Sequence, residues 1–354
     1  MDKEKLASLL IGPDATVKQA MKQMDKIGQK SLFVVNQENI LQGSLTDGDI
    51  RRWILKGGSL EENVNNIGNK NPVAFAEGYD VEHVKKIMLV KKIEHVPVIN
   101  GFKQVVEVLL WEDVFAGHIS KPKEKLNLPV VIMAGGKGVR LDPFTSILPK
   151  PLIPIKGKPI IEIIMDEFNE YQINAFYVSV NHKSGMIKAY FGDVATKYKI
   201  EYLEEDSPLG TAGGLKFLQD KIQGSFVVTN CDIIIKSDYC EIYDYHRENQ
   251  NDITIVGSLR QYVIPYGVCD IENGGILREI REKPEYDFLV GTGFYILESR
   301  VLKYIPKNEP YSMTDLIKKI TKENGKVRVF PISAESWIDV GQWDEYKRAR
   351  EKMQ

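Results

Sequence analysis

A glycine-rich loop and the cationic side chains around it are the residues best suited to chemistry in this sequence. The loop reads Ala134-Gly135-Gly136-Lys137-Gly138-Val139-Arg140. Its glycines let backbone N–H groups approach a phosphate chain closely, and Arg140 adds a positive charge. The loop fits neither the dinucleotide fingerprint nor the Walker pattern, which ends in Gly-Lys-Ser/Thr. Lys150 follows within Pro149-Lys150-Pro151. These residue types indicate a phosphate site of another kind, although a glycine loop alone is more often a plain turn.

Carboxylates and a further lysine stand near the ends of apolar runs. Asp232 follows the strand-like run 226–229, and Asp339 lies within Trp337-Ile338-Asp339-Val340-Gly341. An aspartate at a strand end often only caps a turn. Two such carboxylates, together with phosphate oxygens and water, can instead complete an octahedral Mg²⁺ site. A further lysine, Lys283, lies in Glu282-Lys283-Pro284.

The stretch that contains the loop resembles the signature of the sugar-1-phosphate nucleotidyltransferases. Residues 133–162 read MAGGKGVRLDPFTSILPKPLIPIKGKPIIE, so that glycine loop, arginine, Pro-Lys-Pro and Gly-Lys-Pro occur in the family's order. The resemblance extends from residue 129 to about residue 350. It departs at Val139, where the family usually has threonine, at Cys231, where glycine is usual, and at Gly291, where many relatives have asparagine. It implies in-line attack of a sugar phosphate oxygen on the α-phosphorus of a nucleoside triphosphate, with Mg²⁺ as cofactor and pyrophosphate as leaving group.

The family's site residues carry over to the matching positions of this chain. The resemblance implies catalytic roles for Arg140, Lys150, Asp232 and Lys283, and Mg²⁺ ligation by Asp232 and Asp339. It implies nucleotide contacts from Ala134, Gly135, Gly136, Gly138, Glu205, Gly210 and Thr211. It implies sugar contacts from Gly267, Glu282 and Thr292.

Glu205 bears on the choice of base, because segment 202–214 resembles the family's base-binding loop. Relatives that use thymidine or uridine triphosphate often carry glutamine at this position. A carboxylate only accepts hydrogen bonds, which suits the adjacent N1–H and 2-amino groups of guanine and repels uracil carbonyls. Glu205 therefore favours GTP. The alternative is that its side chain faces solvent and that Glu204, or neither residue, contacts the base.

In this chain the transferase pattern follows an N-terminal third that contains an internal repeat. This arrangement is similar to that of the glucosamine-1-phosphate guanylyltransferases of legionaminic acid biosynthesis, with mannose-1-phosphate guanylyltransferases next. The expected substrates are a nucleoside triphosphate and a sugar 1-phosphate, with glucosamine favoured and mannose second. Two alternatives stay open. One is a non-catalytic relative that senses nucleotide, and the other is an active transferase that uses UTP, dTTP or CTP, or a phosphate acceptor such as phosphocholine.

An internal repeat occupies the first third of the chain. The pattern Thr16-Val17…Met24 recurs as Asp80-Val81…Met88, and the apolar run that ends at Asn36 recurs at Asn100, always at an offset of 64 residues. Each unit is typical of a helix, a strand, a turn, a second strand, and a helix that begins at an aspartate. The two units span about residues 5–60 and 67–118.

These repeats resemble a tandem pair of CBS domains, a Bateman module. The resemblance depends most on residues 43–50, GSLTDGDI, and implies an adenosine nucleotide site at Thr46, Asp49 and Asp113. Leu110 stands where the first repeat has Thr46, and Glu107 where it has Gly43. Alternatively, the module only packs or assembles the protein. Because CBS pairs often associate, we expect a homo-oligomer.

The amino-acid composition limits the partners and the cellular compartment that we expect for this protein. The 47 basic and 49 acidic residues nearly cancel, so nucleic acid and membrane surfaces are not expected partners. The three cysteines lack metal-ligand spacing and suggest a reducing compartment. Without a signal-peptide pattern or a long apolar run, we expect a cytoplasmic protein.

The elements that must position these residues change character near residue 120. We expect the regulatory repeats over residues 1–120, a polar linker over 121–128 and the transferase domain over 129–354. Apolar runs predict strands at 130–134, 176–180, 226–228, 253–256, 292–297 and 327–331. A helix is predicted from Pro159, with isoleucines and Phe168 on its apolar side. The expected fold is α/β, a tandem CBS module followed by a Rossmann-like, mixed-sheet (GT-A-like) domain with ligands at the carboxyl ends of the strands.

Overall fold

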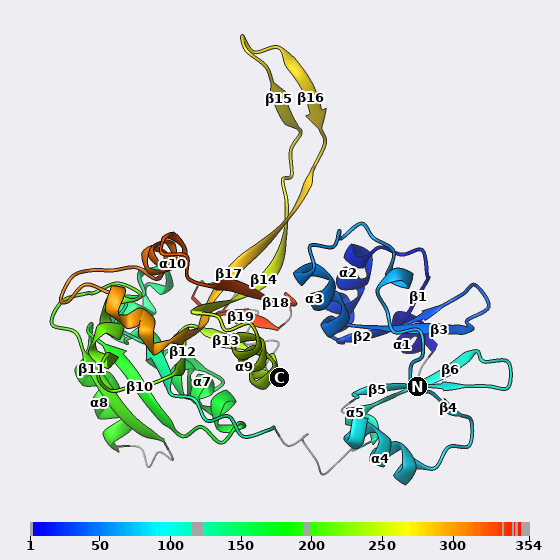
Figure 1. Ribbon diagram of the computed structural model, residues 1–354, viewed down its shortest axis with the longest axis horizontal. Coiled ribbons are helices and arrows are strands. Elements are labelled where there is room, and N and C mark those ends of the chain that lie inside the picture. The colour runs from blue at the N-terminus through cyan, green and yellow to red at the C-terminus, as the bar shows by residue number, and fades with distance from the viewer. Residues whose placement is uncertain are drawn as a thin grey trace. The chain divides into compact units, whose positions relative to one another are not determined.

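The computed structural model describes residues 3–91, 93–114, 123–193, 198–334, 336–341, 343 and 346–347 (Figure 1). The chain divides into two compact units, Met1–Lys123 and Glu124–Gln354. The division falls within the predicted linker, of which residues 121 and 122 lie outside the described residues together with the end of the second repeat.

The first unit contains the two predicted repeats. The first consists of α2 (Val17–Ile27), β2 (Ser31–Val35), β3 (Leu41–Thr46) and α3 (Asp47–Leu55). The second consists of α4 (Val81–Lys91), β5 (His95–Ile99), β6 (Val105–Leu110) and α5 (Trp111–Val114). The order of elements is as predicted, except that α3 begins at Asp47, two residues before the expected Asp49, because Thr46 is its N-cap. The remaining elements are α1 (Lys3–Ser8), β1 (Leu10–Ile11), η1 (Val64–Asn66) and β4 (Phe75–Ala76).

The two repeats pair with each other about an approximate twofold axis. Ile40 bridges Gln104, its counterpart at the repeat offset. The Leu41 N–H donates to the Lys103 carbonyl (3.0 Å), and Val105 donates to Asn39 in the symmetric bond (2.9 Å). Equivalent positions of the repeats thus meet each other, so the duplication in the sequence becomes a symmetry of the first unit.

The second unit is built on a seven-stranded sheet of order β11-β10-β7-β12-β17-β14-β18. Its strands are β7 (Val130–Met133), β10 (Ala175–Val180), β11 (Lys199–Glu204), β12 (Ser225–Asn230), β14 (Ile253–Val263), β17 (Glu285–Glu298) and β18 (Val327–Ile332). β17 runs antiparallel to its neighbours β12 and β14, whereas the other adjacent pairs are parallel. This mixed sheet after an N-terminal repeat confirms the predicted fold class. The edge strand β11 was not predicted as a strand, because its residues had been assigned in part to the base-binding loop.

Helices and short strands complete the second unit. They are η2 (Val139–Leu141), α6 (Phe144–Ile147), η3 (Lys150–Leu152), β8 (Pro154–Ile155), β9 (Lys158–Pro159), α7 (Ile160–Asn169), α8 (Ser184–Asp193), η4 (Gly213–Leu218), β13 (Ile233–Ile235), α9 (Tyr239–Glu248), β15 (Val268–Ile271), β16 (Leu277–Arg281), η5 (Ser299–Tyr304), α10 (Met313–Lys322) and β19 (Trp337–Asp339).

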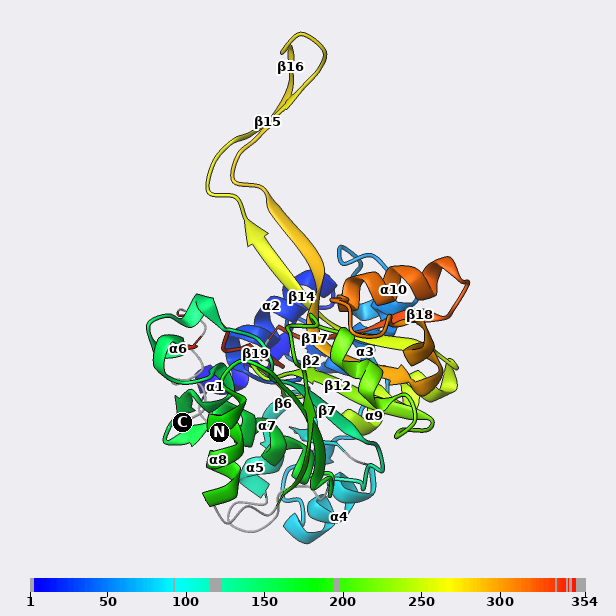
Figure 2. The same ribbon diagram turned by 90° about the vertical axis from the view of Figure 1, so that its left-hand side faces the viewer.

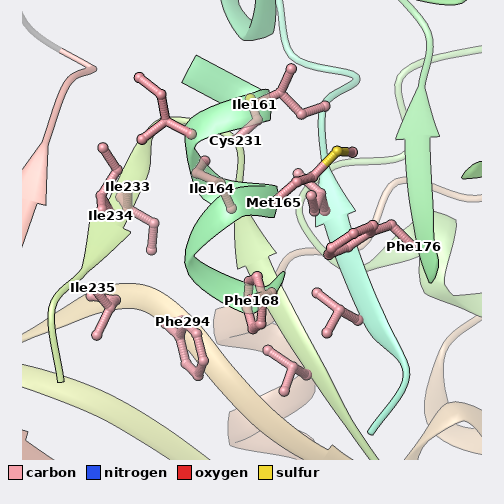
Figure 3. Close-up of a cluster of buried hydrophobic side chains, with 14 of the residues drawn as sticks. Ile161, Ile164, Met165, Phe168, Phe176, Cys231, Ile233, Ile234, Ile235 and Phe294 are labelled. Carbon is pink, nitrogen blue, oxygen red and sulfur yellow. The ribbon is translucent and has the colours of Figure 1, made fainter. Parts of the chain in front are cut away.

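The sheet is buried on both faces, which explains its unbroken apolar runs. Val130 and Ile132 of β7 belong to one hydrophobic cluster, whereas Val131 between them belongs to the cluster on the opposite face. On the first face, α7 buries Ile161, Ile164 and Phe168 against the sheet, as the sequence predicted, and Met165 beside them (Figure 3). Truncation of a buried aromatic such as Phe168 typically costs about 3–5 kcal/mol, so this contact holds the helix firmly in place.

β14 and β17 are much longer than the runs predicted for them. Beyond the sheet they continue as a ribbon into the hairpin of β15 and β16, which projects away from the rest of its unit as an arm (Figures 1 and 2). None of the helices in the described part of the chain is long and apolar enough to cross a membrane.

Candidate active site

Strands β7, β10, β11 and β12 run parallel, so their carboxyl ends lie at one edge of the sheet. The glycine loop follows β7, Glu205 follows β11, and Asp232 follows β12. Because ligands of open α/β sheets bind at this edge, the topology places the predicted nucleotide and metal residues where a substrate can reach them together.

Gly138 explains why the loop needs glycine. Its φ of +68° favours glycine, and an added Cβ would lie 2.9 Å from Cβ of Lys150 and 3.0 Å from Cγ2 of Thr145. The loop therefore packs directly on the Lys150 side chain. By contrast, an added Cβ at Gly136 would meet nothing within 4 Å. That open space leaves the backbone at Gly136 accessible to a ligand.

The other end of the loop faces the predicted base reader. Ala134 is buried, and its N–H donates to the Ser179 carbonyl (2.9 Å). An added Cβ at Gly135 would lie 3.4 Å from Cβ of Asn181 and 3.6 Å from Oε1 of Glu205. Gly135 therefore lies between the phosphate loop and the carboxylate predicted to read the base.

The two predicted metal aspartates lie beside Lys150. β13 and β19 pair antiparallel with Ile233 opposite Asp339, and the Val340 N–H donates to the Asp232 carbonyl (2.9 Å). The Lys150 ammonium contacts Oδ2 of Asp232 in an ion pair whose two partners are both buried.

Gly341 marks the point where these side chains converge. A Cβ added there would lie 2.4 Å from Oδ2 of Asp232, 3.0 Å from Oδ1 of Asp339 and 3.2 Å from Nζ of Lys150. The Gly341 N–H also donates to Oδ1 of Asp339 (2.7 Å). The absent side chain leaves two carboxylates and one lysine around one small space, and this close approach requires glycine.

The charges at this point favour a cation. Burial raises the pKa of Asp339, and the nearby charge of Asp232 raises it further; the Gly341 hydrogen bond, Lys150 and Arg140 act in the opposite direction. The described part of the chain contains no group of three or more histidine, cysteine, aspartate or glutamate side chains that could hold a metal ion by itself. The buried carboxylate of Asp232 and the half-buried one of Asp339 need substrate oxygens to complete a coordination shell. They fit Mg²⁺, which is usually held by one or two carboxylates plus phosphates.

Cys231 does not face this site. Its side chain is buried in the core cluster near α7 (Figure 3), and burial raises the pKa of its thiol to about 12. The departure from glycine at this position is accommodated by the hydrophobic core and removes no group from the site.

Glu205 is buried and held by hydrogen bonds, so the alternative of a solvent-facing side chain is wrong. Oε1 accepts from the Ser179 hydroxyl, and Oε2 accepts from the Leu209 N–H (2.9 Å). The Asn181 amide donates to the Glu205 carbonyl (2.6 Å). A carboxylate with two fixed donors still has lone pairs for two more. The other carboxylate considered for this role, Glu204, pairs with Lys188 and is largely exposed.

Gly210 and Thr211 hold the base loop against the segment before α10. An added Cβ at Gly210, where φ is +78°, would lie 2.8 Å from the Tyr311 carbonyl oxygen. The Thr211 hydroxyl accepts from the Met313 N–H (2.8 Å). Both residues thus shape the loop around Glu205, and a direct nucleotide contact from either remains a prediction.

The predicted sugar residues lie along the ribbon of β14 and β17. An added Cβ at Gly267 would lie 3.2 Å from Oε2 of Glu282, so these two residues are neighbours. Lys283 is exposed at the base of the arm, with a φ of +45°. Thr292 is buried, and its hydroxyl donates to the Val256 carbonyl (2.9 Å). Across the described residues, no hydrogen bond or ion pair joins this group to the aspartates.

In the first unit, Thr46 and Asp49 bond to each other. They form a capping box at the start of α3, in which the Thr46 N–H and hydroxyl donate to Oδ2 of Asp49 (2.9 and 2.7 Å). Arg52 pairs with Oδ1 of the same carboxylate (2.5 Å). Asp113 is exposed on the short helix α5. The cap accounts for both residues of the first repeat structurally, and their nucleotide role remains a prediction.

Sequence reasoning missed Ser179, Asn181 and Gly341. The first two precede the base loop by more than twenty residues and reach Glu205 only through pairing of β10 with β11. Gly341 lies two residues after Asp339 in the motif Trp337-Ile338-Asp339-Val340-Gly341. A glycine so near a candidate metal ligand indicates a close approach of other groups, and this signal could have identified it.

Profiles of two known families match this chain. The nucleotidyl transferase family matches residues 129–354, and the CBS domain matches residues 8–56 and 64–117. The two matched regions fall in the second and first structural units, respectively.

Curated relatives show the same resemblance over the second unit. A UTP–glucose-1-phosphate uridylyltransferase of Synechocystis sp. is 30% identical over 63% of this chain and 62% of its own length. The bifunctional protein GlmU of Methanococcus maripaludis is 32% identical over 61% of this chain and 52% of its own length. A mannose-1-phosphate guanylyltransferase of Mycobacterium tuberculosis is 29% identical over 62% of each. The chain thus spans only about half to three fifths of these relatives.

Among solved structures, HddC from Yersinia pseudotuberculosis aligns with a TM-score of 0.52 at 27% identity, over 64% of this chain and 100% of HddC. Together with the converging loop, lysine and aspartates, the match over residues 129–354 shows that this chain belongs to the nucleotidyl transferase family, with CBS domains ahead of its transferase domain.

Proposed function

We propose that the chain is a Mg²⁺-dependent enzyme that transfers a nucleotidyl group from GTP to a sugar 1-phosphate, with glucosamine 1-phosphate favoured and mannose 1-phosphate next. The observation that supports this most strongly is the convergence of Asp232, Asp339 and Lys150 around Gly341, next to a glycine loop that packs on Lys150. A sensor that only bound nucleotide would not need a buried and a half-buried carboxylate kept close together at a free-energy cost.

The reaction requires positioning and charge more than covalent help. A phosphate oxygen of the sugar 1-phosphate attacks the α-phosphorus, the bond from that phosphorus to the bridging oxygen breaks, and pyrophosphate leaves with the electron pair. The glycine loop and Arg140 bind the triphosphate, and Lys150 balances the charge of Asp232. Mg²⁺ held by Asp232 and Asp339 would supply positive charge to the phosphate oxygens during transfer.

The preference for GTP depends on Glu205. Ser179 and the Leu209 N–H fix its carboxylate in a buried position beside Gly135. A rigid group that can only accept matches the N1–H and 2-amino donors of guanine and repels a uracil carbonyl. Relatives point both ways: one is named a guanylyltransferase and another a uridylyltransferase, and HddC has been crystallised with GMP-PN. UTP is therefore the competing donor.

The activity test is pyrophosphate release by the full-length chain with Mg²⁺. GTP, UTP, dTTP, CTP and ATP are each crossed with glucosamine, mannose and glucose 1-phosphates. We expect turnover with GTP and little with the other donors. Turnover with UTP alone would support the proposed reaction but contradict the role of Glu205 in base selection. If folded protein released no pyrophosphate with any pair of substrates, the proposal that the chain is an enzyme of this kind would be wrong.

We also propose that the CBS domains bind an adenosine nucleotide at Thr46 and Asp49 and adjust the activity or assembly of a homo-oligomer. Binding there requires the Asp49 carboxylate to exchange part of its capping and Arg52 contacts for a ribose diol. A repeat of the panel with ATP, ADP or AMP added separates regulation from a purely structural module.

A further inference from the structure

The order of the strands separates the donor side of the site from the acceptor side. Glu205 follows the edge strand β11, the phosphate loop follows β7, and Asp232 follows β12. If the proposed transfer is correct, the triphosphate occupies the β11-to-β7 side, so the attacking phosphate must approach from the β17 and β14 side. The inference below rests on that proposed function.

Arg260 lies on β14, on this acceptor side. Its guanidinium carbon is 4.6 Å from the centroid of the Trp337 ring, in a cation–π contact. No carboxylate of the described residues lies within 4.0 Å of it, unlike Arg300, which pairs with Asp252 at 2.6 Å. Arg260 is therefore a partly buried cation whose hydrogen-bond donors are held by stacking and are not used by an acid.

Trp337 connects Arg260 to the metal aspartates. It lies in β19 two residues before Asp339, and β19 is fixed by pairing of Trp337 with Ile235 and of Asp339 with Ile233. Side chains two residues apart in a strand point to the same face, roughly 6–7 Å apart. The indole thus lies two residues from Asp339 on the same face of β19, and the Arg260 guanidinium stacks on it.

Two buried side-chain polar atoms without a hydrogen-bond partner lie near this arginine, on Ser258 and Trp337. Asn251, Ser258 and Trp337 are the described residues that have a buried side-chain polar atom without a hydrogen-bond partner. Ser258 precedes Arg260 by two residues on the same strand, and Trp337 lies beneath its guanidinium. A buried polar atom without a partner costs free energy, and a ligand that supplies the missing hydrogen bond would remove that cost.

Arg260 also lies between the aspartates and two of the predicted sugar contacts, Gly267 and Glu282. It pairs with Phe288 in the ribbon, and three residue pairs farther on, Val263 pairs with Glu285 next to Pro284. Beyond that pair come Lys283 and Glu282, with Gly267 beside the glutamate. A sugar 1-phosphate with its phosphate near the metal and its sugar toward Glu282 would pass over Arg260.

We propose that Arg260, stacked on Trp337, binds the phosphate of the sugar 1-phosphate and sets its approach to the α-phosphorus. A guanidinium presents a planar fork of N–H donors that binds two phosphate oxygens at once, and its stacked face needs no acid to orient it. Lysine offers only a point charge, so an Arg260→Lys variant would bind the phosphate less well than wild type does.

The first experiment compares steady-state kinetics of wild type, Arg260→Ala and Arg260→Lys, with Arg328→Ala as matched control. Arg328 lies on β18 and bonds to Asn249 (2.7 Å), away from the site residues. We expect Arg260→Ala to raise KM for the sugar 1-phosphate at least about 10-fold with KM for GTP within twofold, and Arg260→Lys to recover only part. An unchanged acceptor KM in folded Arg260→Ala, or an equal rise in both KM values, would overturn the inference.

The second experiment does not require turnover. Intrinsic tryptophan fluorescence is titrated with glucosamine 1-phosphate, inorganic phosphate and free glucosamine. We expect a change with both phosphates and none with glucosamine, and loss of the change in Trp337→Phe and Arg260→Ala. Absence of any phosphate response in wild type rejects the site. Phosphate binding in a protein without turnover would keep this site and reject the proposed function, so the two failures are distinguishable.

Discussion

Replacement of Gly341 by alanine tests the convergence of the aspartates with a single methyl group. The new Cβ would lie 2.4 Å from Oδ2 of Asp232, so this oxygen must move about 0.6 Å to reach 3.0 Å, the shortest contact that side chains normally tolerate. Oδ1 of Asp339 and Nζ of Lys150, at 3.0 and 3.2 Å, block the nearest directions of relaxation. The carboxylates are therefore pushed apart or turned away from each other.

The expected effect is large on activity and small on stability. A misplacement approaching 1 Å at a reacting centre can cost about 100-fold, so we expect kcat/KM of Gly341→Ala to fall by about that factor. Gly341 does not have a positive φ, so the backbone accepts alanine. The lower entropy of the unfolded chain adds about 0.4–1 kcal/mol of stability, which offsets part of the crowding.

The assay is pyrophosphate release, combined with a melting curve and with Mn²⁺ titration as a probe of the metal site. Gly192→Ala is the matched control, because a Cβ at Gly192 in α8 would meet nothing within 4 Å. If Gly341→Ala kept kcat/KM within threefold of wild type and bound Mn²⁺ equally well, the carboxylates would not act together as we describe.

Further predictions concern the base, the CBS domains and pH. In Glu205→Gln the amide can turn its oxygen to the Leu209 N–H and its NH₂ to the Ser179 hydroxyl, so the protein should fold, while kcat/KM for GTP relative to UTP falls about 10–100-fold; an unchanged ratio would remove Glu205 as base reader. An adenosine nucleotide should raise the melting temperature of wild type but not of Asp49→Ala, and no shift in wild type with ATP, ADP or AMP would leave the CBS domains as a structural module. Burial lowers the pKa of His246, so the unfolded chain binds the proton first as pH falls below 6.5. Stability should therefore decline on acidification by up to about 1.4 kcal/mol per pH unit, with a shallower slope in His246→Gln, measured by urea unfolding at several pH values; equal slopes would contradict this account.

Local patterns predicted most of the fold. The repeat offset, the apolar strand runs and the isoleucine face of α7 all depend on residues close together in the sequence, and the structure has them where expected. β11 was missed because an edge strand that alternates exposed residues resembles a polar loop. The arm was missed because its apolar residues, such as Ile271, Leu277 and Ile280, are exposed, whereas apolar runs in a sequence normally indicate buried strands.

The candidate site, like the fold, was predicted only where local motifs report it. The glycine loop, Lys150 and Asp232 were found from their motifs. The space at Gly341 arises where residues from three distant segments meet, and no local spacing reports a contact of that kind. Arg260 and Trp337 likewise come together only through the packing of β14 against β19. Local motifs thus predicted several of the site residues, whereas the contacts among those residues depend on long-range strand pairing.

The most direct test of the central claim is product analysis by mass spectrometry and ³¹P NMR. Full-length chain is incubated with GTP, glucosamine 1-phosphate and Mg²⁺, alongside Asp232→Asn. We expect GDP-glucosamine and pyrophosphate in equal amounts from wild type and at least a 100-fold lower rate from the variant, which keeps its fold. No nucleotide sugar from wild type with any donor and sugar 1-phosphate, or an undiminished rate in Asp232→Asn, would contradict it.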